Sequence, residues 1–238
     1  MLGDGELNLI NEAQGSITNG EDSTLYIDTG ANTIMNAGLI GEAGTGGIVV
    51  RSAVYNTGKF SVANGELTFD AAVSGSGIAA IFSGVLKFNS TFSENVVFDG
   101  STGKLYLADS QAYTGEILGF AKAGGTYLDL GDVAFKKGIT TATFAPTANA
   151  RGSGGVLTVT DGVHVASFQL VGNFLQSTFV LGGDGSGGTV ITTRAAPQPG
   201  AFVSAMAAFA APAAGSAHLE VSPVAVPSMI AAGHGHAT

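Results

Sequence analysis

The sequence contains no cysteine, and only 11% of its 238 residues are charged. Without cysteine, the chain cannot form a disulfide, a thiolate metal site or a cysteine nucleophile. The charged share is about half that of an average protein, whereas 45% of the residues are apolar, which is enough to form a core. A soluble protein with so few charges covers its surface with Ser, Thr, Asn and Gly, a composition typical of extracellular β-rich repeat proteins.

Positive charge is especially scarce. Nine basic residues stand against eighteen acidic ones, which gives a net charge of −9. This charge repels phosphate backbones, and Lys136-Lys137 is the only adjacent basic pair. The acidic residues are scattered singly. The sequence therefore predicts no nucleic-acid partner, and we expect the negative charge simply to keep the protein soluble.

Long apolar runs and an N-terminal leader pattern are also lacking. The start, MLGDGELNLI, has neither a basic segment nor an apolar run, so no Sec signal peptide is predicted in this chain. The most apolar part of the C-terminal tail is broken by Pro212 and Gly215. No stretch reaches transmembrane length, and no membrane span is predicted.

The most regular stretch is Gly65–Thr102, which consists of two blocks of nineteen residues. Both blocks open with Gly-x-Leu-x-Phe and place a second large apolar residue, Val73 or Phe92, six positions after the Leu. The block that starts at Gly46 has the same length, with Val54 at the sixth position. A fixed period with alternation inside each block predicts an all-β fold, a single-stranded β-solenoid (parallel β-helix) with right-handed coils of about 19 residues.

The same signature divides residues 5–124 into six predicted coils. Their first inward positions are Leu7, Leu25, Ile48, Leu67, Leu86 and Leu105. Within one coil, Leu67 and Phe69 should face inward while Glu66 and Thr68 face water. Further along the coil, we expect Val73, Ile78 and Ile81 to face inward as well. Stacking would place the repeated leucines in one aliphatic column.

Asparagine and glycine recur where the coils are expected to bend. The sites are Asn19-Gly20, Asn36-Ala37-Gly38, Asn56-Thr57-Gly58 and Asn64-Gly65. These residues suit bends that need positive φ, and the asparagines could form a ladder between coils. The alternative is a β-sandwich of hairpins, in which Asn64-Gly65 would be a type I′ turn. The regular period favours the solenoid.

The pattern changes near Gly124. Residues 125–194 are predicted to form a β-rich C-terminal cap or irregular last coils, because a solenoid must cover its final strand edges. Within this region, residues 156–170 read as a hairpin around Asp161-Gly162. Its expected buried face is Leu157, Val159, Ala166, Phe168 and Leu170. The Ala- and Pro-rich tail, residues 195–238, has Phe202, Met206 and Phe209 at helical spacing, which predicts a short helix before Pro212.

Several motifs are candidates for functional sites. The glycine-rich stretch 182–188 resembles a calcium-binding nonapeptide, but Gly187 stands at the carboxylate position and there is a single copy, so a hairpin loop is expected. The carboxylates considered as acid–base pairs are Asp129, Asp132, Asp161 and Asp184. The isolated cations and imidazoles are Arg51, Arg151, Arg194, His164, His218, His234 and His236. No convincing cluster results, so structural or solvated roles are predicted, with no catalytic, cofactor-binding or metal residue.

Residues 156–189 carry a longer pattern, a TVTDG run followed by a histidine, alternating apolar positions and a glycine-rich loop. Its matching positions are His164, Ala166, Leu170, Gly172, Phe174, Phe179, Leu181, Asp184 and Gly185. Together with NTIMNAGLIGE and NGELTFDAAVSGSG, it resembles the C-terminal module that follows stacked β-repeats in large bacterial secreted and surface proteins, including autotransporter-like adhesins. The tail is similar to the C-termini of type I secretion substrates, which carry an uncleaved export signal. The resemblance implies architecture and an extracellular or cell-surface location, and no reaction.

The function expected from the sequence is that of a non-enzymatic, extracellular, adhesin-like β-solenoid. Its partners would be a cell-surface polysaccharide or protein, and the type I secretion machinery through the tail. One alternative is a β-helix lyase or hydrolase acting on acidic polysaccharide, with Asp70, Lys87 and Lys104 as candidate residues. A second alternative is a component of a trimeric fibre.

Overall fold

A computed structural model describes residues 7–149 and 152–196. The helix expected over residues 202–209, the proposed export signal, the three tail histidines and Arg151 lie outside the described residues. No helix in the described ranges is both long and apolar enough to cross a membrane.

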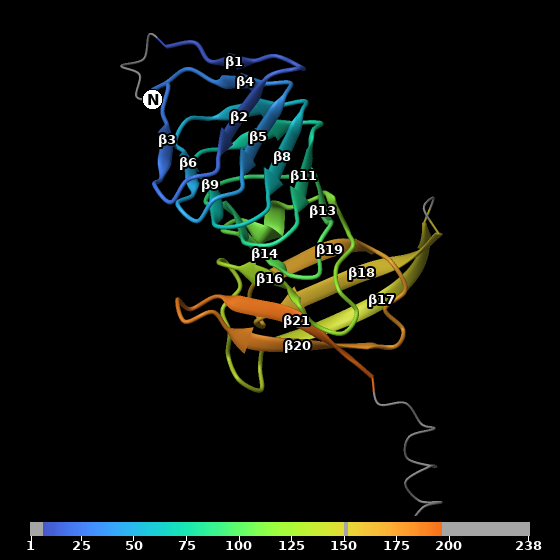
Figure 1. The fold of residues 1–238 in the computed structure, drawn as a ribbon. Helices are drawn as coiled ribbons and strands as arrows, with labels where there is room; N and C mark the ends of the chain where they lie inside the picture. The colour runs from blue at the N-terminus through green and yellow to red at the C-terminus, as the bar shows by residue number, and fades with distance from the viewer. Residues whose placement is uncertain (1–6, 150–151, 197–238) are drawn as a thin grey trace, which may run out of the picture. The chain divides into compact units, whose positions relative to one another are not determined.

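The described strands form three sheets (Figure 1). The four-stranded sheet contains, in spatial order, β1 (Ile10–Asn11), β4 (Ile34–Asn36), β7 (Val54–Asn56) and β10 (Val73–Gly75). The nine-stranded sheet contains β2 (Ser16–Asn19), β5 (Leu39–Glu42), β8 (Lys59–Val62), β11 (Ile78–Ile81), β13 (Asn95–Phe98), β15 (Glu116–Leu118), β19 (Val165–Val171), β18 (Gly152–Thr160) and β17 (Thr141–Asn149). The eight-stranded sheet contains β3 (Leu25–Ile27), β6 (Ile48–Val50), β9 (Glu66–Phe69), β12 (Val85–Phe88), β14 (Gly103–Leu107), β16 (Thr126–Leu130), β21 (Thr189–Ala195) and β20 (Ser177–Gly183).

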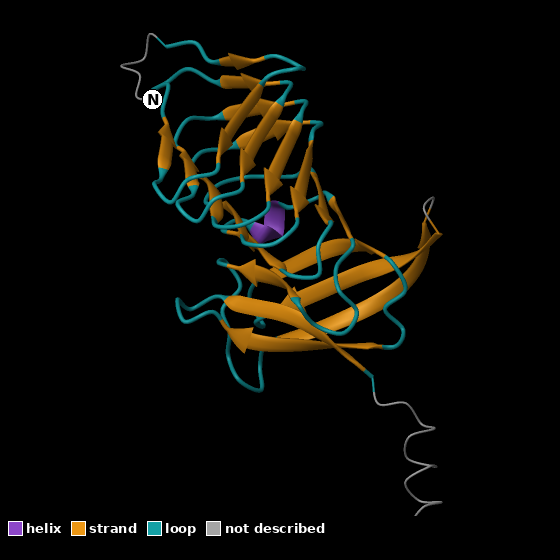
Figure 2. Ribbon diagram, in the orientation of Figure 1, coloured by secondary structure: helices purple, strands orange, loops and turns teal. Residues whose placement is uncertain are grey.

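In each of the first four coils the chain visits the four-, nine- and eight-stranded sheets in turn, and in the last two coils it has strands only in the nine- and eight-stranded sheets. Strands of successive coils pair in parallel, and β3 to β16 give six coils in the eight-stranded sheet. In the sixth coil a short 3-10 helix, η1 (Ser110–Ala112), leads to β15 and is drawn purple in Figure 2. The predicted β-solenoid is therefore confirmed. The β-sandwich is excluded, because β8 and β9 on either side of Asn64-Gly65 belong to different sheets.

Repeated apolar positions stack into continuous columns inside the solenoid. Leu86 pairs in register with Leu67 on one side and with Leu105 on the other, and all three are fully buried. In a parallel column, the ring of Phe88 stacks on Phe69 at 5.1 Å, and it stacks on Phe92 at 3.6 Å. Burial of such side chains removes a large apolar area from water and is the main source of stability between coils.

Three details of the predicted coil are corrected. The leucine column begins at Leu25 rather than Leu7, because residues 7–9 lead into β1 of the four-stranded sheet. Ile78 is 39% exposed, since it lies three positions from the inward Ile81 and therefore on the opposite face of β11. Thr68 faces outward as expected but is only 5% exposed, and its hydroxyl donates to Glu66 at 2.6 Å.

The glycines at the bends serve a different purpose from the one expected. Of the four Asn–Gly sites, only Gly65 has a positive φ, at 59°. Gly38 and Gly58 are required by close stacking instead. A Cβ atom on Gly38 would lie 2.3 Å from the carbonyl oxygen of Gly15, and one on Gly58 would lie 2.1 Å from that of Gly38. Small residues at this corner therefore let successive coils approach each other.

After β16 the chain forms two antiparallel units, β17–β19 and β20–β21, which pair with the last coil: β19 runs parallel to β15, whereas β21 runs antiparallel to β16. In the nine-stranded sheet, β19 lies beside β15 and carries β18 and β17 with it. In the eight-stranded sheet, β21 pairs antiparallel with β16 and carries β20. The β18–β19 hairpin is connected by residues 161–164, and its five expected inward residues are all fully buried. These strands, β17 to β21, are called the cap below.

Candidate functional site

Asp161 organises the turn of the β18–β19 hairpin. One carboxylate oxygen accepts the backbone N–H groups of Val163 at 2.9 Å and His164 at 2.7 Å. The other accepts the N–H of Ala134 at 3.3 Å, and lies 3.1 Å from Nδ1 of His164 and 3.8 Å from Nζ of Lys136. Hydrogen bonds from His164 and then Val163 hold the pKa of this carboxyl well below its usual range. Asp161 therefore joins the hairpin turn to the half-exposed His164 and to the backbone of Ala134.

Asp184 closes the glycine-rich loop between β20 and β21. Its Oδ1 accepts the backbone N–H groups of Ser186 at 2.7 Å and Gly188 at 2.8 Å, and its own N–H donates to the carbonyl of Gly188. Within the described ranges, no group of three or more His, Cys, Asp or Glu residues could hold a metal ion. The loop is a hairpin connection with an aspartate at its centre.

Asp132 fixes the short helix of the sixth coil. Its Oδ1 accepts the hydroxyl of Ser110, and its Oδ2 accepts the backbone and side-chain N–H groups of Gln111, both at 3.1 Å. Asp132, Asp161 and Asp184 therefore each hold a different loop. They do not form a carboxylate pair.

The fourth candidate, Asp129, lies in a groove on the outer face of the eight-stranded sheet. The register sets Glu66, Val85 and Lys104 in one outward column, and Lys87, Tyr106 and Asp129 in the next. The loop after β20 closes one end of this groove, which we call the charged groove. Its volume is about 210 Å³, and its lining residues are Glu66, Val85, Lys87, Lys104, Tyr106, Asp129, Asp184 and Ser186.

An ion pair crosses the charged groove. Nζ of Lys104 lies 3.0 Å from Oδ2 of Asp129, whose side chain is only 6% exposed. Oδ1 of Asp129 is buried and has no hydrogen-bond partner among the described residues. One buried acceptor of a residue that lines the groove therefore has no partner, an arrangement that is costly in a folded protein.

Two further polar groups of the charged groove lack hydrogen-bond partners among the described residues. Nζ of Lys87 lies 5.2 Å from the ring centroid of Tyr106 and forms no ion pair with any described residue. Burial raises the pKa of the Tyr106 hydroxyl, and the charges of Asp129, Asp184 and Asp132 raise it further. The phenol consequently stays protonated and is a hydrogen-bond donor at neutral pH.

The structure brings together two of the three residues suggested for polysaccharide chemistry. Lys87 and Lys104 both line the charged groove. Asp70 does not, because it lies beyond the end of β9 and accepts a 2.8 Å hydrogen bond from Nδ2 of Asn89. Sequence reasoning missed Tyr106 as a groove residue. The signal was present, since Thr68, Lys87 and Tyr106 follow one another at intervals of nineteen residues.

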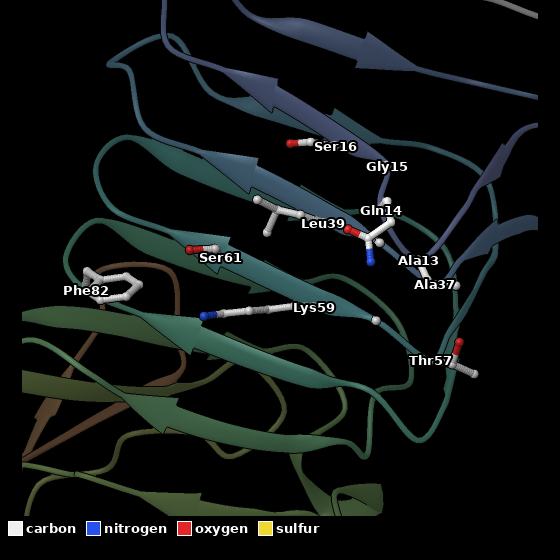
Figure 3. Close-up of a pocket in the computed structure, with 12 residues that line it drawn as sticks. Ala13, Gln14, Gly15, Ser16, Ala37, Leu39, Thr57, Lys59, Ser61 and Phe82 are labelled. Atoms are coloured by element: carbon white, nitrogen blue, oxygen red, sulfur yellow. The ribbon is translucent and has the colours of Figure 1, made fainter.

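A second, larger groove runs over the outer face of the nine-stranded sheet (Figure 3). Its volume is about 680 Å³, and it is lined by Ala13, Gln14, Gly15, Ser16, Ala37, Gly38, Leu39, Thr57, Gly58, Lys59, Ser61 and Phe82. Lys59 supplies its only charge, and Nζ lies 5.7 Å from the ring centroid of Phe82. The rest of the lining is uncharged, and it combines polar side chains such as Gln14 and Ser61 with the apolar Leu39 and Phe82.

A polar ladder runs inside the solenoid. The side chain of Asn11 donates to Asn36, Asn36 donates to Asn56, each at 2.6 Å, and Asn56 donates to the carboxylate of Glu94 at 2.7 Å. The predicted ladder between Asn36 and Asn56 is therefore present. The in-register position of the next coil is Gly75, which has no side chain, and Glu94 from the coil beyond it completes the ladder.

Glu94 is the one ionisable member of the ladder. The residue is 4% exposed, and its Oε1 has no hydrogen-bond partner among the described residues. Burial raises the pKa of this carboxyl to about 7, against the lowering effect of the hydrogen bond from Asn56. The ladder consequently ends in a group that titrates near neutral pH.

Comparisons of the chain with family models, with curated proteins and with solved structures found no match. The resemblance of residues 156–189 to the C-terminal modules of secreted proteins therefore stays a prediction. The interpretation of the grooves depends on their geometry alone.

Proposed function

We propose that this chain is a non-enzymatic structural module that forms the capped C-terminal end of an adhesin-like β-solenoid, displayed outside a bacterial cell. The observation that carries the proposal is that antiparallel units of the cap pair with both edge strands of the last coil, β19 with β15 and β21 with β16. Parallel coils alone would leave open strand edges, which invite aggregation. A cap that pairs with the last coil and carries a proline in its outer strand β17 suits a rod that must remain soluble.

The carboxylates support a scaffold role. Asp132, Asp161 and Asp184 each accept several hydrogen bonds from the loop in which they lie or the loop beside it. These hydrogen bonds hold the loops in place, so we assign the three side chains to loop geometry.

The export part of the proposal is tested by deleting residues 195–238. We expect the deletion variant to accumulate inside cells that carry a type I secretion system, while the intact chain reaches the medium. The matched control replaces the same residues by a scrambled sequence of identical composition, which should also abolish export. Unchanged secretion of the deletion variant would overturn the proposed role of the tail.

One observation favours a second candidate function. Lys87 and Lys104 line the same groove, so a lyase that acts on acidic polysaccharide could use them to bind and neutralise a carboxylate. Incubation with polygalacturonate and alginate, followed by detection of unsaturated product, distinguishes the two functions. Cleavage that Lys87→Ala abolishes would favour the enzyme, and no cleavage by the intact chain favours the scaffold.

A further inference from the structure

We propose that the charged groove binds a segment of an uncharged saccharide chain. This inference adds a class of ligand to the proposed adhesin-like function. It rests on that proposed function only in placing the protein outside the cell. It begins from three polar groups of the groove, the partly exposed Nζ of Lys87 and hydroxyl of Tyr106, and the buried, unpaired Oδ1 of Asp129. They comprise two donors and one acceptor on adjacent strands.

Saccharide hydroxyls match this set because each can donate and accept a hydrogen bond. Oδ1 of Asp129 is buried, so a hydroxyl can donate to it only if the side chain turns toward the groove, and this bond would satisfy an oxygen that is otherwise unpaired. Hydrogen bonds to ionised groups are stronger than those between neutral groups, which favours contacts with Lys87 and Asp129. The apolar surface needed by a sugar ring is supplied by Val85 and the ring of Tyr106.

Charge argues for a neutral ligand. Three carboxylates line the groove, from Glu66, Asp129 and Asp184, against the two ammonium groups of Lys87 and Lys104, which leaves one net negative charge. The whole chain also carries a net charge of −9. A polyanion would meet repulsion both at long range and inside the groove, whereas an uncharged chain would not.

The position of the groove argues against a peptide. Extended peptides commonly bind by adding a strand to a sheet edge, where backbone groups are free. The strands under this groove, β9, β12, β14 and β16, each pair with a strand on both sides. No backbone ladder is available there, and Val85 is the only aliphatic side chain in the lining.

The length of the charged groove suits a short segment of a longer saccharide chain. The groove crosses four strands, which at ~4.8 Å between neighbours corresponds to about 14 Å. The loop that contains Asp184 and Ser186 lies at the cap end of this span. An extended ligand would therefore contact both the coils and the cap.

The test uses isothermal titration calorimetry of the full chain with cellohexaose, maltohexaose and laminarihexaose as neutral probes. Hexagalacturonic acid and an uncharged Gly-Ser repeat peptide are titrated in parallel. The variants are Tyr106→Phe and Lys87→Met, with Tyr55→Phe as the matched control. Tyr55 is similarly placed on the outer face of the four-stranded sheet, where it is 43% exposed and does not line the charged groove.

We expect at least one neutral hexasaccharide to bind, and each groove variant to weaken that binding by about three- to tenfold, the loss of one hydrogen bond. Tyr55→Phe should leave the affinity unchanged. The inference is overturned if no neutral probe binds, if only the acidic oligosaccharide or the peptide binds, or if both groove variants bind as the intact chain does. These outcomes do not depend on export, so a failure here is distinct from a failure of the proposed role of the tail.

Discussion

Glu94 makes the stability of the solenoid depend on pH. The pKa of its carboxyl rises from 4.5 in the unfolded chain to about 7 in the folded one, because the side chain is buried. Between these values the native state binds more protons than the unfolded state, so the free energy of unfolding falls as pH rises. The stabilisation is complete below about pH 4.5 and is lost by about pH 7, and the difference amounts to about 3 kcal/mol.

We predict that Glu94→Gln removes this part of the pH dependence. The amide oxygen of glutamine can still accept the hydrogen bond from Asn56, and glutamine does not titrate. The measurement is urea denaturation at pH 5 and pH 8 for the intact chain and the variant. The variant should be more stable than the intact chain at pH 8, with a smaller change between the two pH values. The exposed Glu21→Gln serves as the control, and equal slopes for all three proteins would contradict the prediction.

Glu42 is a second buried carboxyl with an energetic cost. The residue is 1% exposed, and neither carboxylate oxygen has a hydrogen-bond partner among the described residues. Its in-register neighbours are Asn19 on one side and Val62 on the other, followed by Ile81. The position therefore belongs to a column that becomes apolar toward the cap.

We predict that Glu42→Met stabilises the protein by about 1–3 kcal/mol, the cost of leaving a buried polar group unsatisfied. Methionine retains the unbranched shape of the glutamate side chain and adds no polar atom. Urea denaturation at neutral pH measures the effect. A lower midpoint for the variant would show that Glu42 has a partner that offsets its burial.

At the scale of one strand, the two faces of β12 should differ sharply in their contribution to stability. Leu86 is fully buried between Leu67 and Leu105, whereas Val85 faces outward. We predict that Leu86→Ala destabilises the protein by about 2–5 kcal/mol, through lost burial and the cavity left in the column. Val85→Ala, the control on the same strand, should cost less than about 1 kcal/mol. Urea denaturation measures both free energies of unfolding. A similar decrease for the two variants would contradict the leucine column as the source of stability.

The elements differ in how far the sequence predicts them. Spacing of nineteen residues places Leu67, Leu86 and Leu105 in one column, because a solenoid of constant coil length keeps its register. The inward position predicted for Ile78 is wrong, because its apolar character conflicts with strict alternation along β11, and alternation decides which face it takes.

The set of residues that forms the charged groove could not be predicted from the sequence. Lys87 and Tyr106 follow the regular spacing, whereas Asp129 comes twenty-three residues after Tyr106, because the sixth coil includes the short helix η1. Asp184 belongs to the cap, in the loop between β20 and β21. The β21 strand pairs antiparallel with β16, which is distant from it in the sequence. A local pattern encodes neither the longer coil nor the docking of the hairpin, so the site was visible only in the assembled fold.

At the scale of the whole molecule, two sheets still have an open strand edge beyond the last coil, and these edges now belong to the cap. It pairs with the edges of the last coil, but β17 and β20 become the outer strands of their sheets. The β17 strand is nine residues long, and an edge of this length is a template for association with another chain. Pro146 interrupts it near the middle, opposite Gly155. Since proline lacks a backbone N–H, it removes one donor from the exposed edge.

We therefore predict that Pro146→Val promotes association of two copies through their β17 edges. The substitution restores an edge donor and adds a residue that favours strands. Sedimentation velocity over a range of concentrations should show an increase in mass for the variant and a monomer for the intact chain. Ala145→Val is the control, because it adds the same side chain beside Pro146 and leaves the donor missing. Association of both variants alike would assign the effect to surface hydrophobicity, and association of neither would show that another feature protects the edge.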